Sequence, residues 1–191
     1  MGRPRNFEAD DVVERAMDAF WTHGYANTSP ADLAAATGIG KGSLYNTFGS
    51  KRQLFDQAFA HYSVRGAELA REFLAEPGGT RERVRDFLRM LVDTDLAQPI
   101  RRGCMAVNTA VEFAGQDPDI DRAILEATEG VIAALADRIE QGRRDGDIRA
   151  DIDPRVYAEY LMTTIGGLRI MAKTFDAATL HRVIDTTVST L

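Results

Sequence analysis

A short segment near the N-terminus carries hydroxyl and amine groups at the starts of successive expected helices. Thr28 and Ser29 precede one such helix, where their hydroxyls and the free amides of the first turn could bind a phosphate. Lys41 opens the next helix, and Gly42 beside it would let the backbone approach a ligand closely. Lys51 stands at the start of a third helix. Hydroxyls and free amides at a helix start are groups that can bind a phosphate.

The other groups capable of chemistry do not form an active site. The three histidines are scattered singly and lack the close spacing of a metal-binding pair. Asp117, Asp119 and Asp121 alternate, but the rest of a calcium loop is missing, and helix capping explains them better. No phosphate-cradling glycine loop or nucleophile elbow occurs. The sequence predicts no catalytic residue, metal site or cofactor, and a protein that is not an enzyme.

Cys104 is the one cysteine in the chain, so no intrachain disulfide can form, and a reducing cytoplasm is expected. It follows Arg101 and Arg102 and is expected to open a helix. Nearby arginines and a helix N-terminus both stabilise a thiolate, which favours a reactive thiol at Cys104. The alternative, a small buried apolar side chain, stays open.

Apolar residues recur at helical spacing along the chain, which predicts an all-α fold. Glycines and capping residues set the expected ends, such as Gly24 after the first helix and the Ser50–Gln53 capping box before the fourth. No apolar stretch is long enough to span a membrane, and no signal peptide is expected. The expected helices cover about 10–23, 30–37, 41–48, 50–76, 80–96, 104–114, 118–144, 154–175 and 177–190.

Residues 29–48 carry the clearest pattern. Two helices of about two turns are separated by Gly38-Ile39-Gly40, a turn tight enough to hold the second helix steeply across the first. The second helix could then enter a major groove. The net charge of −6 does not oppose this, because residues 22–52 carry three bases against one acid. The expected buried contacts between the two helices are Leu33, Ala36, Ile39, Leu44 and Phe48.

These residues resemble the TetR/AcrR family of transcriptional repressors. The resemblance is specific over about residues 3–62 and architectural beyond them. It implies an N-terminal three-helix helix-turn-helix DNA-binding domain over 1–52, a connecting helix over about 50–76, and a ligand-binding and dimerisation domain over 53–191, with about nine helices in total. It rests on Phe20-Trp21, Gly24-Tyr25, Thr28-Ser29, Asp32-Leu33-Ala34, Gly38-Ile39, Gly42-Ser43-Leu44-Tyr45, Phe48, Ser50-Lys51, Leu54-Phe55 and the Gly-Arg-Pro-Arg opening.

The resemblance also implies which residues bind operator DNA. Tyr45 and Lys51 are expected on phosphates and Asn46 on a base or a phosphate, while Arg3 and Arg5 could enter the minor groove from a disordered arm. Packing of Tyr45, simple solvation of Asn46 and an idle arm remain alternatives. The expected DNA-binding set is Arg3, Arg5, Thr28, Ser29, Lys41, Gly42, Ser43, Tyr45, Asn46 and Lys51.

A homodimer on palindromic double-stranded DNA is expected, because one helix-turn-helix makes too few contacts. Apolar stripes along 118–144 and 154–175 are the expected interface, although both could be intrachain core. A small-molecule or reactive effector should release the DNA. The segment with Gly103-Cys104, Asn108 and Glu112 is similar to one branch of the family. This similarity implies that Cys104 could sense oxidants or electrophiles, with Lys173 as its partner. A helical enzyme or an interaction dimer is the less favoured alternative. The expected effector residues are Phe87, Met90, Cys104, Met105, Asn108, Phe113, Tyr160, Thr164 and Lys173.

Overall fold

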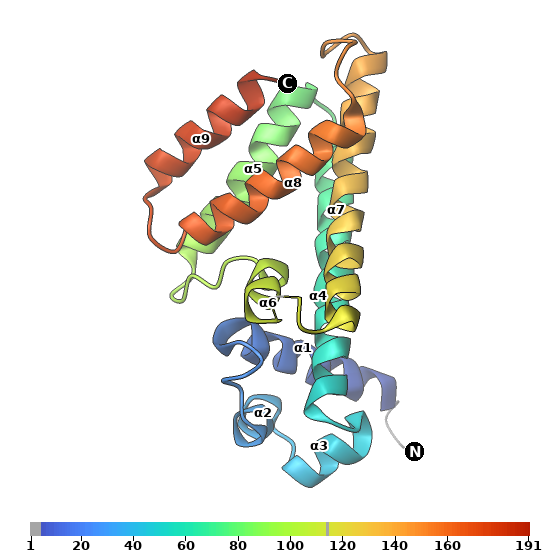
Figure 1. Ribbon diagram of the computed structural model, residues 1–191, viewed down its shortest axis with the longest axis vertical. Coiled ribbons are helices and arrows are strands. Elements are labelled where there is room, and N and C mark those ends of the chain that lie inside the picture. The colour runs from blue at the N-terminus through green and yellow to red at the C-terminus, as the bar shows by residue number, and fades with distance from the viewer. Residues whose placement is uncertain (1–4, 114) are drawn as a thin grey trace. The chain divides into compact units, whose positions relative to one another are not determined.

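The computed structural model describes residues 5–113 and 115–191, without the side chains of residues 5–8. Within these ranges the chain contains helices and no strand, which confirms the predicted all-α fold (Figure 1). No helix in the described part of the chain is long and apolar enough to cross a membrane. The helices are α1 (Arg5–His23), α2 (Pro30–Thr37), α3 (Lys41–Phe48), α4 (Lys51–Ala75), α5 (Thr80–Ala97), α6 (Met105–Phe113), α7 (Pro118–Arg144), α8 (Pro154–Met171) and α9 (Ala177–Ser189).

Local capping sets the ends of the two short helices as the sequence predicted. Ser29 caps α2: its hydroxyl accepts from the Asp32 amide, and the Asp32 carboxylate accepts from the Ser29 amide. Gly38 ends α2 at φ 76°, a conformation that costs glycine little, and Gly49 ends α3 at φ 82°. The turn between α2 and α3 therefore spans three residues.

Two helix ends differ from the expectation. α1 begins at Arg5 rather than near residue 10, so Arg5 belongs to a helix and not to an arm. α8 ends at Met171 rather than Phe175, because the amides of Lys173 and Thr174 bond to carbonyls three residues back instead of four.

The contacts divide the chain into two compact units, each described by itself. Unit 1 comprises residues 1–64 with 105–124, and unit 2 comprises residues 65–104 with 125–191. Thus α6 and the first turns of α7 belong to the same compact unit as the helix-turn-helix. The physical reason is aromatic packing, since Phe113 lies 5.4 Å from the Tyr25 ring and 5.9 Å from the Phe55 ring, centroid to centroid.

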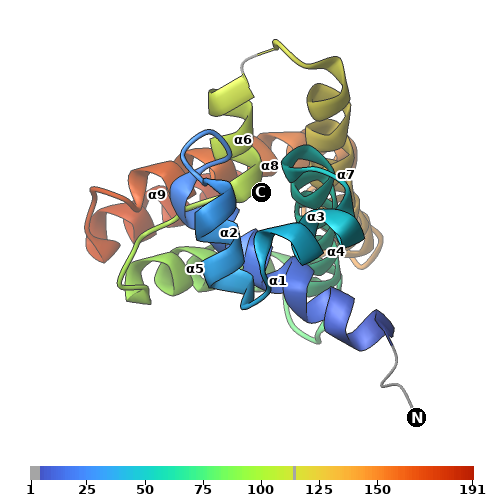
Figure 2. The same ribbon diagram turned by 90° about the horizontal axis from the view of Figure 1, so that it is seen from below.

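In unit 1, α2 and α3 stand beside one another and α2 packs on α1 (Figures 1 and 2). Leu33, Leu44 and Phe48 are buried between them, as expected. Ala36 is exposed and Ile39 half-buried, contrary to expectation. An eight-residue helix buries one face, which in α2 is made by Leu33 and Thr37, and Ala36 lies off that face.

In unit 2, α5, α8 and α9 form the main contacts around an apolar core. The stripe of α7 belongs to this core, with Ala134, Leu135 and Ile139 buried. Gly130 of α7 faces Ala67 of α4 so closely that an added Cβ would lie 2.5 Å from the alanine Cβ. The part of α7 in unit 2 is therefore held by intrachain packing.

Candidate DNA-binding site and effector region

Helix α3 presents a polar face to solvent. Ser43 and Asn46 are exposed on the side away from the buried Leu44 and Phe48, and Lys41 is exposed at the first position of the helix. Since the buried pair anchors the helix, the exposed side chains stand on a rigid support. Gly42 is exposed, and nothing lies within 4 Å of the place a Cβ would occupy.

The start of α2 places the two expected hydroxyl groups differently. Ser29 is exposed, but Thr28 is fully buried and its hydroxyl donates to the Gly24 carbonyl at 2.6 Å. Hydrogen bonds from the Ser29 hydroxyl and then the Ser29 amide lower the pKa of Asp32. An ionised carboxylate therefore belongs to the capping box at this helix start, where the helix dipole favours it.

Tyr45 and Lys51 both lie next to Tyr25, a residue to which the sequence assigned no role. The Lys51 ammonium sits 4.3 Å from the centroid of the Tyr25 ring, which is a cation–π contact. The Tyr45 hydroxyl is buried and has no hydrogen-bond partner among the described residues. Burial raises the pKa of Tyr25, although Arg52 opposes the shift. Because its hydroxyl is buried, the phenol of Tyr45 points into unit 1.

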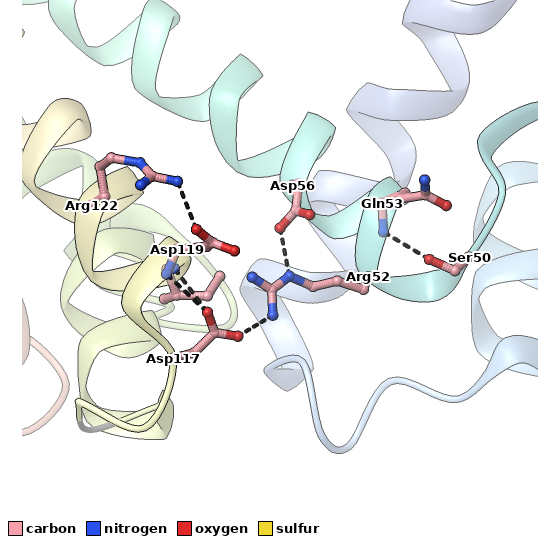
Figure 3. A network of polar contacts seen from close by, with 8 residues as sticks. Ser50, Arg52, Gln53, Asp56, Asp117, Asp119 and Arg122 are labelled. Atoms are coloured by element: carbon pink, nitrogen blue, oxygen red, sulfur yellow. Dashed lines mark hydrogen bonds and ion pairs between the residues drawn. The ribbon is translucent and has the colours of Figure 1, made fainter.

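Arg52 joins the start of α4 to the start of α7 within unit 1 (Figure 3). Its guanidinium bonds to Asp117 and, through Nε at 2.8 Å, to Asp56. The same Asp117 carboxylate accepts from the amides of Asp119 and Ile120, which caps α7. The hydrogen bond from Arg52 is the main reason that the pKa of Asp117 falls to about 2. Capping was predicted for Asp117, but its partnership with Arg52 was not.

Glu112 of α6 is a further residue whose place the sequence did not predict. Its carboxylate accepts hydrogen bonds from the backbone amides of Tyr25 and Ala26 in the turn between α1 and α2. Glu112 and Tyr25 are 87 residues apart in the sequence, so no local sequence pattern could have predicted this contact.

Cys104 lies in unit 2, directly before α6. It is buried, with 3% of its surface exposed. The carbonyl of Gly103 accepts from Arg169 at 3.1 Å, and a Cβ added to Gly103 would lie 3.2 Å from Cε of Lys173. The side chain of Lys173, an exposed residue, therefore passes beside Gly103, which directly precedes Cys104.

The two units divide the remaining expected effector residues. Phe87 is buried and faces Phe73 with ring centroids 5.7 Å apart, whereas Tyr160 is exposed beside Tyr157. Thr164 uses its hydroxyl on the Tyr160 carbonyl. Unit 1 holds Met105, Asn108 and Phe113, and unit 2 holds Phe87, Met90, Cys104, Tyr160, Thr164 and Lys173.

The two expected arm residues contribute nothing further to this geometry. Arg3 lies outside the described residues, and Arg5 is the first residue of α1, with a side chain that is not described.

The arrangement of α2 and α3 defines a helix-turn-helix protein of the DNA-binding class. The two short helices are joined by a three-residue turn, and α3 has an anchored apolar side and an exposed polar side. Residues 12–58 match the family described as "Bacterial regulatory proteins, tetR family". Residues 69–187 match the "Tetracyclin repressor-like, C-terminal domain". The chain therefore belongs to the TetR family of transcriptional regulators.

Similar proteins agree with this assignment. The HTH-type transcriptional regulator YezE of Bacillus subtilis is 31% identical over the full length of both proteins. The HTH-type transcriptional repressor ComR of Escherichia coli is 27% identical, over 100% of this chain and 90% of ComR. A mutant of the TetR family regulator CifR, solved with a 26-bp double-stranded operator DNA, superimposes with a TM-score of 0.85 at 33% identity, covering 98% of each chain. Reduced NemR of E. coli shares the fold, with a TM-score of 0.82 and 19% identity over 96% of this chain and 94% of NemR.

Proposed function

We propose that this regulator is a repressor that binds a palindromic operator as a homodimer and is released by an effector acting outside the helix-turn-helix. The observation that carries the proposal is the exposed polar face of α3, with Lys41, Ser43 and Asn46 standing on the buried Leu44 and Phe48. CifR, similar over nearly the whole chain, was solved on operator DNA, and ComR is a repressor. The role is non-catalytic and places the protein on the chromosome, in the cytoplasm.

The roles within the site follow from the chemistry of each group. Asn46 and Lys41 reach toward base edges from the first turns of α3. Lys51 and the start of α2 bind phosphates. Pro30 has no N–H and the Asp32 amide bonds to Ser29, so Ala31 supplies the first-turn amide for a phosphate.

The remaining residues of the expected set have smaller roles in the proposal. Gly42, Ser43 and the exposed Ser29 hydroxyl line the same surface. Thr28 contributes by fixing the turn before α2, because its hydroxyl is already bonded to Gly24. Arg3 and Arg5 add positive charge at the N-terminus, which favours the minor groove.

Tyr45 reaches a phosphate in this proposal only after a side-chain rotation, because its hydroxyl is buried in the free protein. A buried polar atom without a partner costs free energy. A hydrogen bond donated by the Tyr45 hydroxyl to a phosphate oxygen would therefore offset the cost of the rotation. The variant Tyr45→Phe tests this directly. Weaker operator binding supports a phosphate contact, and unchanged binding assigns Tyr45 to packing.

We infer that the surface of α8 and α9 carries the dimer interface. Apolar side chains are exposed there without a covering element: Val156, Tyr160, Met171, Phe175 and Val183. The first three lie on α8 at spacings that share a helix face, together with the exposed Gly167. Exposed apolar side chains gathered on one face are typical of a protein–protein interface. Part of the α7 stripe, with Ala134, Leu135 and Ile139, packs inside the core of unit 2.

Operator binding is tested by gel shift with the DNA upstream of the protein's own gene, at several salt concentrations. Affinity should fall steeply with salt, because bound cations are released from the phosphates. Lys51→Ala should weaken binding and lower the magnitude of the slope of log K against log salt by about two, since one phosphate in each of the two half-sites is no longer neutralised. Arg71→Ala, which removes an exposed charge from α4 outside unit 1, is the control. Binding indifferent to salt and to Lys51 would disprove the proposal.

The interface is tested by sedimentation of Tyr160→Glu and Val156→Glu. If α8 forms the interface, each substitution places a glutamate carboxylate in the buried interface. Both variant proteins should then be monomers at concentrations where the wild type is dimeric. Val64→Glu, at a similarly exposed apolar position on α4, should remain dimeric. Dimers from both α8 variants would place the interface elsewhere.

A thiol-based release mechanism is the second candidate. The position of Cys104 favours it, since the thiol directly precedes α6 and the Lys173 side chain passes beside Gly103. The burial of the sulfur favours the other interpretation, a packed apolar side chain, with a small molecule as the effector.

A further inference from the structure

A carboxylate from α6 binds the backbone of the turn between α1 and α2. Oε2 of Glu112 accepts from the Tyr25 amide at 2.8 Å, and Oε1 accepts from the Ala26 amide. Both amides lie just beyond the end of α1, where backbone donors have no helical partner. A carboxylate that receives two backbone N–H groups is a strong, geometrically specific contact.

This turn leads directly into α2. Gly24 reverses the chain at φ 80°, and Thr28 closes the turn by donating its hydroxyl to the Gly24 carbonyl and its amide to the Tyr25 carbonyl. Ser29, the N-cap of α2, follows at once. There is little slack around the turn, because a Cβ added to Gly24 would lie 3.1 Å from Oε2 of Glu112.

The side chain of Tyr25 connects the same turn to Lys51. Its ring lies 5.4 Å from Phe113, the last residue of α6, and 5.1 Å from Phe55 on α4, centroid to centroid. The Lys51 ammonium lies over that ring at 4.3 Å. Tyr25 is therefore held by α6 through both its backbone and its side chain, and it contacts a residue proposed to bind phosphate.

We propose that Glu112 is a positioning residue for operator binding, which acts through Tyr25 on Lys51 and on the start of α2. This inference rests on the proposed function. With the carboxylate in place, the turn keeps Lys51 and the α2 N-terminus in the geometry that binds two phosphates. Without it, the Tyr25 and Ala26 amides lose their partners and the turn relaxes.

The same contact gives α6 control over DNA affinity. α6 begins at Met105, whose amide donates to the Tyr62 hydroxyl at 3.3 Å, and it ends at Glu112 and Phe113. A displacement of α6 would therefore weaken both phosphate contacts.

The variant Glu112→Gln tests the proposal, since it keeps the size but places an N–H donor where one backbone amide donates. Operator affinity of the dimer should fall about a hundredfold, because each of its two subunits loses one charge-assisted hydrogen bond, at about tenfold each. Exchange of the Tyr25 and Ala26 amide hydrogens should become faster. Glu126→Gln on α7 is the control, at an exposed glutamate outside unit 1. Glu112→Asp, which keeps the charge but shortens its reach, should bind with intermediate affinity and serves if the glutamine variant does not fold.

A double-mutant cycle separates positioning from a general loss of stability. If Glu112 acts through Lys51, Glu112→Gln combined with Lys51→Ala should weaken binding less than the product of the two single effects. Fully multiplicative effects, or unchanged affinity in Glu112→Gln while the wild type binds, would overturn the inference and leave the proposed function standing. Failure of the wild type to bind the operator would instead disprove the proposed function.

Discussion

Arg169 and Asp95 form a buried ion pair between α8 and α5. Nε of Arg169 donates to Oδ2 of Asp95 at 2.7 Å and Nη2 donates to Oδ1 at 2.8 Å, while Nη2 also reaches the Gly103 carbonyl at 3.1 Å. The two side chains are only 11% and 6% exposed. The pair thereby joins two helices of unit 2 to the segment that ends in Cys104, through the backbone of the preceding residue.

Removing one partner of this pair should destabilise unit 2 strongly. Arg169→Met leaves the Asp95 carboxylate buried without its cation, which should lower the free energy of unfolding by about 3–5 kcal/mol. Urea unfolding followed by circular dichroism measures the loss. Arg169→Met combined with Asp95→Leu should recover most of it, because no charge is left buried. A loss below about 1 kcal/mol in the single variant would show that the pair is not buried in solution.

Gly130→Ala should destabilise the protein by about 1–3 kcal/mol, although alanine is the better helix former. The added Cβ would lie 2.5 Å from the Cβ of Ala67, so α4 and α7 must move apart within unit 2. Gly66→Ala on α4 is the matched control, since nothing lies within 4 Å of its Cβ position, and it should stabilise by about 0.5–1 kcal/mol. Thermal unfolding of the two variants compares them. Equal midpoints would contradict the close approach of the two helices.

The contribution of Asp117 should disappear in acid. Its pKa is lowered from 3.8 to about 2 by Arg52, so the folded state favours the ionised carboxylate. The pair therefore stabilises the protein above the ordinary pKa, and this stabilisation is lost as the pH falls from 3.8 toward about 2. Asp117→Asn removes the charge but keeps an oxygen that can cap α7.

The difference in thermal midpoint between wild type and Asp117→Asn should be present at pH 7 and should shrink as the pH falls through that window. Comparing the two proteins at each pH cancels the titration of the other carboxylates. A difference that stays constant down to pH 2 would mean that the Arg52 contact does not form.

Cys104 should react slowly with thiol reagents in the folded protein. Its 3% exposure keeps the sulfur from bulk reagent, so labelling by a disulfide reagent should speed up strongly in urea. Under the thiol-sensor candidate, hypochlorite or an aldehyde releases the operator from the wild type, and Cys104→Ser stays bound. Identical release of both proteins would remove that candidate and leave a packed cysteine.

The sequence alone determined the parts of this protein that depend on neighbouring residues. Ser29, Asp32, Gly38 and Gly49 set the ends of α2 and α3, and the structure has them where the sequence predicted. Helix caps and glycines in the left-handed conformation act on residues only a few positions away. Their effect can therefore be recognised from the sequence alone. The helix-turn-helix and the family followed from them.

Only the tertiary structure decided which distant residues meet. Glu112 reaches the amide of Tyr25 across 87 positions, and Arg52 reaches Asp117 across 65. Similar apolar stripes on α7 and α8 are covered to different extents, because burial depends on which neighbouring helix covers each face. Leu135 and Ile139 of α7 are buried, whereas Tyr160 of α8 is exposed. A periodic pattern shows that a helix has an apolar side, but the packing of the other helices decides what that side contacts.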